Sequence, residues 1–315
     1  KRYYRGPSGE FLDAFVFGGF DLGGMPLNIK VGQHNVIWGE SLFTTSHGIS
    51  YSQGPIDIAK ALATPGIEAK ELFLPLKQIS AQLGITDDLS VAAQYFFDWD
   101  AFRYPEGGTY LGIVDQIFYG PTGFGGTFSN KGIQAPKKRG DWGVMTKWSP
   151  GWLGGTLGLY YREFTDKNPG LLLHSATSSY ASYFGEDIKL YGVSLSKQLG
   201  EYSVGAEVSY RKNMPLYNVL LSNLSGNAAV LFPHGVPTLN GNTYQARANT
   251  WHAVLNTTAV YAKTFLFDTA SLAAELTYSR LDKVTANQDM YQGENYGQCD
   301  SSRKAILGAN FKDKW

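Results

Sequence analysis

The sequence has 315 residues and a formal net charge of +0, so its charge gives no reason to expect a nucleic-acid partner. No stretch approaches the roughly 20 consecutive apolar residues that a membrane-spanning helix needs. Its one cysteine, Cys299, excludes an internal disulfide framework.

Three features of the composition favour a membrane β-barrel over a soluble enzyme. Aromatic residues make up 14% of the chain, and its 37 glycines suit turns and strands better than helices. Charged residues make up only 17%, against about 25% in an ordinary soluble domain. A barrel strand needs only about ten residues, of which every second one is apolar, so the lack of a spanning helix does not exclude a membrane.

Alternation of apolar and polar residues repeats along the chain and predicts amphipathic strands. From Tyr202 to Arg211, for example, the even positions are apolar, whereas the odd positions include Glu207 and Arg211. A charged residue in the middle of a strand is expected where the polar face lines a wet barrel interior. The predicted strands cover residues 11–21, 27–37, 77–85, 89–99, 140–148, 156–164, 186–196, 201–211, 250–263, 270–280 and 303–312.

Short and long connections alternate between these strands. The short ones are rich in turn residues, as in Gly23-Gly24-Met25-Pro26 and Ser149-Pro150-Gly151. In bacterial barrels the short turns face the periplasm and the long loops face outside. The long connections cover residues 38–76, 100–139, 165–185, 212–249 and 281–302.

Aromatic residues gather near the strand ends, for example Trp38, Trp99, Trp142, Trp148 and Tyr210. They suit the girdles of a barrel at the two membrane interfaces, and the alternative is ordinary cross-strand aromatic pairing.

The sequence therefore predicts an all-β fold, a transmembrane antiparallel β-barrel with at least about twelve strands, as a single domain over residues 1–315. A first strand that ends in a short turn starts outside, which breaks the usual parity, so we expect terminal strands to be missing from this segment. Residues 38–76 are expected to fold inward as a loop or plug, with a short helix at residues 56–62.

Several segments resemble the DUF1302 family, which is uncharacterised and found in the outer membrane of Gram-negative bacteria. The segments are Val31–Ser41, Pro65–Glu71 running into Leu74-Pro75, Glu186–Gly192 and Glu207–Pro215. The resemblance implies a barrel in that membrane and chains longer than this one. It also implies transport of lipids or other apolar molecules, because family members are encoded beside a periplasmic protein family and export pumps.

The strand phase predicts a polar set on the inner face. As a set these residues indicate a polar interior, and each of them either braces the barrel or lines a channel. The candidates are Lys30, His34, Glu40, Gln82, Gln94, Asp98, Arg162, Glu207, Arg211 and Glu275. Glu40 has two interpretations. It belongs either to a constriction with Asp57, Glu68, Lys70 and Glu71, or to a structural anchor paired with an interior Lys or Arg.

The long loops are unusually apolar, and exposed apolar surface marks a binding site or a buried contact. One interpretation is a ligand entrance near the outer leaflet, and the other is loops that fold inward and pack together. The residues concerned are Leu171, Leu172, Leu216, Tyr217, Leu220, Leu231 and Phe232.

No catalytic, cofactor or metal pattern is present in the sequence. His47 has serines nearby, but no nucleophile elbow appears, and no His/Asp/Glu group has ligand spacing. We therefore expect no enzyme, cofactor or metal site. The expected function is passage of small hydrophobic or amphipathic molecules, with outer-membrane lipid, such cargo and a periplasmic protein as partners. The alternatives are a non-conducting scaffold or docking barrel, and a hydrolase in which a Ser or Asp lies within hydrogen-bond reach of a rim histidine.

Overall fold

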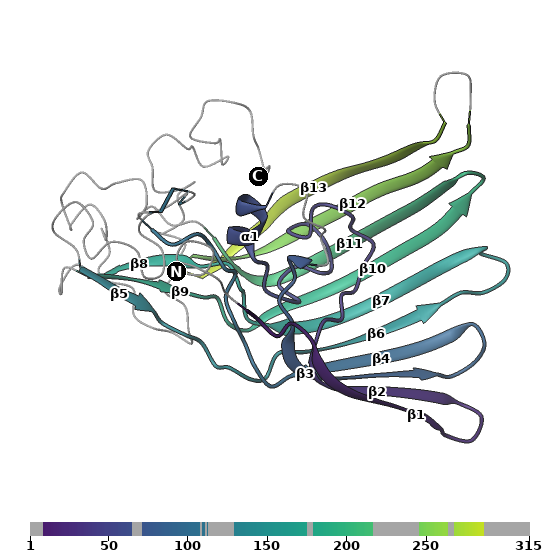
Figure 1. Ribbon diagram of the computed structural model, residues 1–315, viewed down its shortest axis with the longest axis horizontal. Helices are drawn as coiled ribbons and strands as arrows, with labels where there is room; N and C mark the ends of the chain where they lie inside the picture. Colours follow the sequence, from purple (N-terminus) through teal and green to yellow (C-terminus); the bar gives the residue numbers. More distant parts are fainter. Residues whose placement is uncertain are drawn as a thin grey trace.

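The computed structural model describes residues 9–64, 71–107, 109–110, 112, 129–174, 179–216, 246–263 and 268–286. Most of these residues belong to one antiparallel sheet of ten strands, in the order β1-β2-β3-β4-β6-β7-β10-β11-β12-β13 (Figure 1). Its strands are β1 (Ala14–Asp21), β2 (Pro26–His34), β3 (Leu76–Gly84), β4 (Leu89–Phe96), β6 (Trp142–Trp148), β7 (Gly155–Phe164), β10 (Ile188–Leu199), β11 (Tyr202–Pro215), β12 (Arg247–Tyr261) and β13 (Ala270–Ala286).

The ten strands coincide with the first ten predicted ones, and the hairpins pair as expected. Short turns join β1 to β2, β3 to β4, β6 to β7 and β10 to β11. They lie together at one end of the sheet, the end at which β12 stops and β13 begins (Figure 1). In the first turn, Gly23 and Gly24 adopt φ of 67° and 90°, where a side chain would be strained. The predicted strand at residues 303–312 lies outside the described residues.

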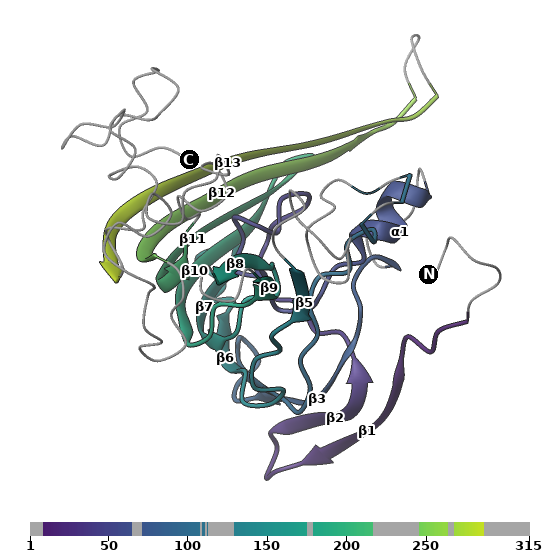
Figure 2. The same cartoon turned by 90° about the vertical axis from the view of Figure 1, so that its left-hand side faces the viewer.

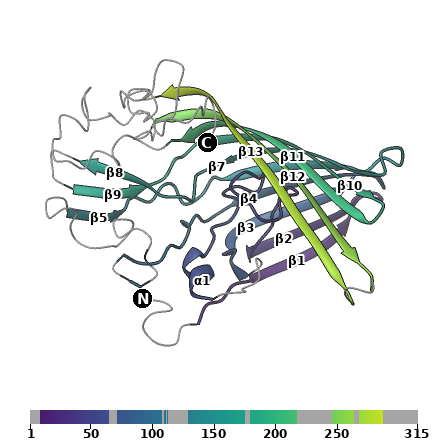
Figure 3. The same cartoon turned by 90° about the horizontal axis from the view of Figure 1, so that it is seen from above.

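The sheet curves strongly, as Figures 2 and 3 show, and residues 35–64 and 71–75 lie on its concave side, helix α1 (Ile58–Ala63) among them. The helix falls where residues 56–62 predict one, and its N-cap Asp57 accepts the backbone N–H of Lys60 at 2.8 Å. Strands β1 and β13 are the two edges of the sheet within the described chain. In that part of the chain, no helix is long and apolar enough to cross a membrane.

Three strands were missed by the sequence analysis, which assigned their residues to loops. β5 (Ser129–Ile133), β9 (Ser179–Tyr183) and β8 (Gly170–His174) form a separate sheet in the order β5-β9-β8, beyond the long-loop ends of the ten strands (Figure 1). All five residues of β9 are buried, so the strand shows no apolar–polar alternation to detect.

Two of the long strands extend further than predicted, to Pro215 in β11 and to Ala286 in β13. The register of β11 against β12 shifts between Arg211 and Met214, and Asn213 has φ of 64°. Such an irregularity interrupts the period of two, which is why the alternation stops at residue 211 although the strand continues.

Candidate functional site

Residues 36–53, here called the plug segment, cross the concave face of the sheet with little regular structure. Its glycines are required by close contacts. Gly39 has φ of 103°, and a Cβ there would lie 2.5 Å from a carboxylate oxygen of Glu207. The backbone of the segment therefore lies in direct contact with side chains of the sheet, and its buried amide groups need hydrogen-bond partners from the sheet.

Glu207 on β11 supplies two of those contacts. One carboxylate oxygen accepts the backbone N–H of Glu40 at 2.8 Å, and the other accepts that of Ile49 at 2.9 Å. The side chain is buried, at 3% exposure. One carboxylate thus fixes two points of the plug segment that lie nine residues apart in sequence.

Two arginines bind the carbonyl groups of the same segment. Arg162 on β7 donates to the carbonyl oxygens of Ile49 and Tyr51 at 2.7 and 2.8 Å. Arg211 on β11 donates to those of Ser46 and Gly48 at 2.9 and 2.8 Å. Both arginines are 1% exposed, so these are buried, charge-assisted bonds.

Glu275 on β13 holds the next turn of the plug segment. Its carboxylate accepts the backbone N–H groups of Leu42 at 2.6 Å, Phe43 at 3.3 Å and Thr44 at 2.7 Å. Three successive amides around one carboxylate form an anion-binding nest, occupied here by the protein itself.

Tyr51 and Ser52 connect the plug segment to the connection after β7. Tyr51 donates its hydroxyl to Asp166 at 2.8 Å, and Ser52 donates to the same carboxylate at 2.9 Å. Burial raises the pKa of Asp166, and burial with the neighbouring Asp166 charge raises the pKa of Tyr51. Burial lowers the pKa of Lys167, whose ammonium lies 3.4 Å from Asp141.

Ser279 on β13 lies between two histidines. Its Oγ is 2.5 Å from Nδ1 of His47 and 3.0 Å from Nδ1 of His252. Nε2 of His252 is bonded to the Thr250 hydroxyl at 2.9 Å. Burial, followed by the nearby Arg211 charge, lowers the pKa of His47, so its ring is neutral at pH 7.

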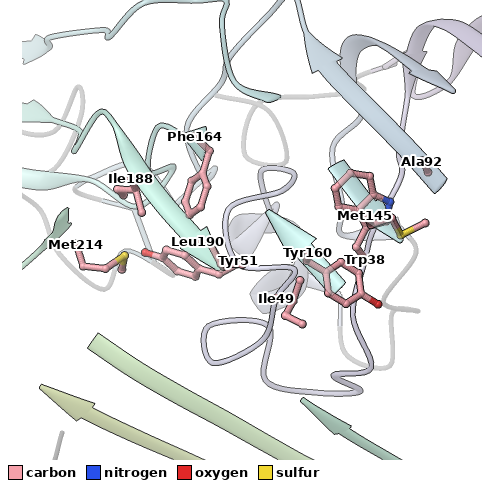
Figure 4. Close-up of a cluster of buried hydrophobic side chains, with 10 residues drawn as sticks. All are labelled: Trp38, Ile49, Tyr51, Ala92, Met145, Tyr160, Phe164, Ile188, Leu190 and Met214. Atoms are coloured by element: carbon pink, nitrogen blue, oxygen red, sulfur yellow. The ribbon is translucent and has the colours of Figure 1, made fainter. Parts of the chain in front are cut away.

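An apolar cluster closes the space between the plug segment and β6–β11. Ile49 is fully buried and sits over Gly192, where a Cβ would lie 2.8 Å from the Ile49 side chain. The cluster comprises Trp38, Ile49, Tyr51, Ala92, Met145, Tyr160, Phe164, Ile188, Leu190 and Met214 (Figure 4).

On the side of β1 to β4, the space between the sheet and the plug segment is not filled. A pocket of about 450 Å³ remains between β1, β2, β3, β4, β6 and the start of the plug segment. We call it the β1–β4 pocket. Its polar lining comes from Asn28, Lys30, Ser80 and Gln82, and its apolar lining includes Phe15, Phe17, Val36, Trp38 and Met145.

The predicted inner-face residues therefore divide into groups. Arg162, Glu207, Arg211 and Glu275 hold the plug segment, whereas Lys30 and Gln82 line the β1–β4 pocket. Gln94 accepts a bond from Gln53 of the plug segment at 3.1 Å. His34 is buried and bonded to Ser80 at 2.8 Å. Asp98 lies apart from both groups, beyond the end of β4, and accepts the backbone N–H of Trp99.

Glu40 is held as an anchor, but not by an interior Lys or Arg. Its carbonyl oxygen accepts from Asn256 at 2.5 Å, and its carboxylate accepts from Ser194 at 3.3 Å. Of the other charged loop residues, Asp57 pairs with Arg103 at 2.6 Å and Glu71 with Lys60 at 3.2 Å. Glu68 and Lys70 lie outside the described residues.

Few of the apolar loop candidates can be placed. Leu216 is 7% exposed and donates its N–H to Ala246, so it is buried and is not an exposed ligand contact. Leu171 and Leu172 belong to β8, a strand, and not to a loop. Tyr217, Leu220, Leu231 and Phe232 lie outside the described residues.

Sequence reasoning missed Ser279, Asp166 and Arg247. Ser279 lies in the predicted strand at residues 270–280 and shares the inner-face phase of Glu275, but its phase alone does not mark it as a site residue. Asp166 lies in an irregular connection, where no period exists to reveal its partners. Arg247 is buried and donates to the Asn213 carbonyl at 2.8 Å, next to the shifted register of β11 that ends the alternation.

The opposite, convex face carries a row of aromatic residues across six neighbouring strands. Tyr161, Tyr191, Tyr210 and Trp251 are successive cross-strand partners, with the rings of Tyr210 and Trp251 4.5 Å apart. Trp142 extends the row, its ring 5.3 Å from that of Tyr161. The aromatic row is Tyr95, Trp142, Tyr161, Tyr191, Tyr210 and Trp251.

Charged residues lie directly beyond this row, toward the long loops. Tyr161 donates its hydroxyl to Glu163 at 3.1 Å, and Tyr210 donates to Asp282 at 2.7 Å. On the other side of the row, outward positions of the same strands hold Val144, Leu159, Val193, Val208 and Leu255. Charge returns only beside a short turn, at Lys197, whose ammonium donates to the Leu153 carbonyl.

One family model matches this chain, described as "Protein of unknown function (DUF1302)", over residues 1–310. No curated protein and no solved structure matches it.

Proposed function

The chain belongs to the DUF1302 family, and from this premise we propose that it is an outer-membrane β-barrel protein that passes small hydrophobic or amphipathic molecules. The observation that carries the proposal is the contrast between the two faces of the sheet. Between the aromatic row and Lys197 beside a short turn, the outward positions of the convex face are uncharged, while the concave face binds the plug segment through buried charges.

The convex face has the chemistry of a surface in contact with lipid. Aromatic residues with a polar tip belong at the membrane interface, and charged residues belong beyond it. Tyr202 and Tyr210 on β11 are eight residues apart, which is about 27 Å along a strand. A tilt of about 40° brings this span to roughly 20 Å, close to the apolar band of about 25 Å in known outer-membrane barrels.

Both edges of the sheet are also apolar and open. Val16 and Phe17 on β1 are 76% and 75% exposed, and Leu276 on β13 is 69% exposed. Exposed apolar edges are a liability in water, whereas a barrel removes them by pairing them. In our proposal the edges pair within the complete barrel, either with each other or through further strands.

Within this barrel the cargo passes on the β1–β4 side. Four charged side chains fix the plug segment against β7, β11 and β13, and three of them, Arg162, Glu207 and Arg211, are buried, so displacing the segment breaks several charge-assisted bonds. The β1–β4 pocket lies beside the plug and joins apolar walls to a few polar groups, which is the composition of a small-molecule site.

Two alternatives have their own support. Dense packing around Ile49 favours a non-conducting barrel that acts as a scaffold for periplasmic or surface partners. The contact of Ser279 with His47 favours a hydrolase, since it meets the condition that a Ser lies within reach of a His. The second histidine, His252, is oriented by a threonine hydroxyl and not by a carboxylate, which weakens the hydrolase alternative.

The test is uptake of the amphipathic probe N-phenyl-1-naphthylamine by Gram-negative cells that express the full chain in the outer membrane. Expression of the wild type is expected to raise uptake, and Ala92→Trp, which fills the β1–β4 pocket, is expected to lower it again. The matched control is Ala253→Trp, an outward position on β12. Uptake that does not rise with correctly inserted wild type supports the scaffold and contradicts transport.

Conductance across a planar bilayer then separates the types of route. Steady ionic current that survives Ala92→Trp places the open path elsewhere and contradicts passage through the β1–β4 pocket. Current or uptake that falls in Ala92→Trp and not in Ala253→Trp supports it.

A further inference from the structure

The β1–β4 pocket has the dimensions and lining of a site for one elongated amphipathic molecule. Its volume of about 450 Å³ lies within the range of small-molecule sites. Phe15 and Phe17 come from the inner face of β1, since they pair with Gly32 and Lys30 of β2. Val36 and Trp38 of the plug segment, together with Met145 of β6, complete the apolar lining.

Lys30 is the cation of this pocket. Its ammonium lies 4.2 Å from the centre of the Phe15 ring, and within the described residues it makes no ion pair. Its cross-strand partners, Phe17 and Ser80, are uncharged. Arg162 and Arg211 differ in this respect, because their guanidinium groups are bonded to plug carbonyls.

Trp38 contributes an unused hydrogen-bond donor at the same place. The residue is 4% exposed, and its Nε1 has no hydrogen-bond partner in the described part of the protein. Figure 4 shows the indole nitrogen on the edge of the ring that faces Ala92 and Met145, both of which line the pocket. Buried N–H groups almost always have an acceptor, so this one is available to an oxygen atom in the pocket.

We propose that the β1–β4 pocket binds an amphipathic carboxylate with an aliphatic chain, such as a medium- or long-chain fatty acid. The carboxylate pairs with Lys30, the chain packs against Phe15 and Phe17, and Trp38 donates its N–H to an oxygen of the ligand. The inference rests on the proposed transport function and names the class of its cargo.

The experiment measures equilibrium binding of radiolabelled dodecanoate and its methyl ester to the full chain in lipid nanodiscs, with empty nanodiscs subtracted. The wild type is expected to bind the carboxylate at least about tenfold more tightly than the ester, as expected for one charge-assisted contact. Lys30→Met, which keeps an unbranched side chain and removes the charge, abolishes this preference, and Lys30→Arg retains it. Lys77→Met is the matched control, because Lys77 is exposed near the start of the neighbouring strand β3.

A second pair of variants tests the remaining contacts. Trp38→Phe is expected to weaken binding of both ligands while leaving the preference for the carboxylate, because it removes the N–H donor and part of the apolar lining and leaves Lys30 in place. Ala92→Trp is expected to prevent binding of both ligands by filling the pocket. Circular dichroism and nanodisc insertion confirm that each variant is folded.

Equal binding of acid and ester by the wild type, or an undiminished preference in Lys30→Met, overturns the proposal. Loss of the preference in Lys77→Met as well would show a general surface effect and also overturns it. Wild type that raises probe uptake in cells without Lys30-dependent binding contradicts only the cargo class. Lys30-dependent binding without uptake contradicts the transport function and supports the binding site.

Discussion

Replacing Glu207 by glutamine is expected to loosen the plug segment without unfolding the sheet. The wild-type carboxylate accepts two buried backbone N–H groups, from Glu40 and Ile49. Glutamine keeps one acceptor oxygen, so one charge-assisted bond is lost, which costs about 1.5–3 kcal/mol. Since about 1.4 kcal/mol is a factor of ten, opening of residues 40–49 becomes roughly 10- to 100-fold more frequent.

Hydrogen exchange with mass spectrometry measures this opening directly. In the variant, peptides covering residues 36–53 should exchange roughly 10- to 100-fold faster, while those from β10 and β12 stay unchanged. The control is Glu201→Gln, because Glu201 is exposed beside the turn between β10 and β11. Unchanged exchange of residues 36–53 in the Glu207 variant would show that the carboxylate does not hold the plug, and would refute this account.

Three further predictions concern the same face. In a Cys299→Ser background, a disulfide between Glu40→Cys and Gly205→Cys is expected to leave probe uptake unchanged, because the wild-type plug segment already stays in place. Uptake that falls on oxidation and returns with reductant would contradict a fixed plug segment. The Glu40 Cβ lies 3.1 Å from an ideal Cβ at residue 205, slightly less than the usual 3.5–4.5 Å, and the Asn256 amide oxygen lies 2.7 Å from the same Cβ. The bond therefore needs a small shift of residue 40 and of the Asn256 side chain. The wild type should hydrolyse p-nitrophenyl esters no faster than Ser279→Ala, and a rate that depends on Ser279 would favour the hydrolase. Hydrogen exchange of residues 41–48, corrected for its intrinsic pH dependence, should rise as the pH falls from 7.5 to 5 in the wild type and not in His47→Gln.

The sign of the pH effect follows from the pKa of His47. Burial lowers this pKa in the folded protein, so below the unfolded value of 6.5 the unfolded segment binds more protons than the folded one. The plug is therefore less stable below pH 6.5 and regains its stability as the pH rises to that value. The groups that face His47 are Arg211, His252, Glu275 and Ser279. Exchange that slows on acidification would contradict this sign.

The strands of the large sheet could be predicted because their two faces differ, one being polar or packed against the plug segment and the other largely apolar. This two-sidedness imposes a period of two, which the sequence records at Glu207 and Arg211 and loses where the register of β11 shifts. The three short strands could not be predicted in this way, since β9 is buried on all sides. Alternation therefore reports a difference between two environments and fails where that difference ends.

The inner-face residues could be predicted, but not their partners. Strand phase places Arg162 and Glu275 on the inner face, whereas their partners are backbone groups of a segment without regular structure. Backbone amides are present in every residue and leave no trace in composition or spacing. The sequence could indicate that a plug exists, and only the structure shows that it is held by its main chain.

In the transport function that we propose, binding of the plug segment through its main chain bears on the route of the cargo. Charged side chains of β7, β11 and β13 bind main-chain groups of residues 36–53, so side chains of this segment that do not contact the sheet in the same way shape the remaining space. Trp38 shows this division. Its backbone N–H donates to the Gln53 side chain at 2.8 Å, while its indole ring lines the β1–β4 pocket. The inner-face charged groups on β7 and β11 are hydrogen-bonded to the plug segment, whereas the ammonium of Lys30 on β2 lies over the Phe15 ring. If cargo passed along β7, β11 and β13, it would need to break the hydrogen bonds between charged side chains and main-chain groups of the plug segment, each of about 1.5–3 kcal/mol. The unfilled side requires no such break, and we therefore place selectivity at Lys30 and Trp38 and stability at Glu207 and its neighbours.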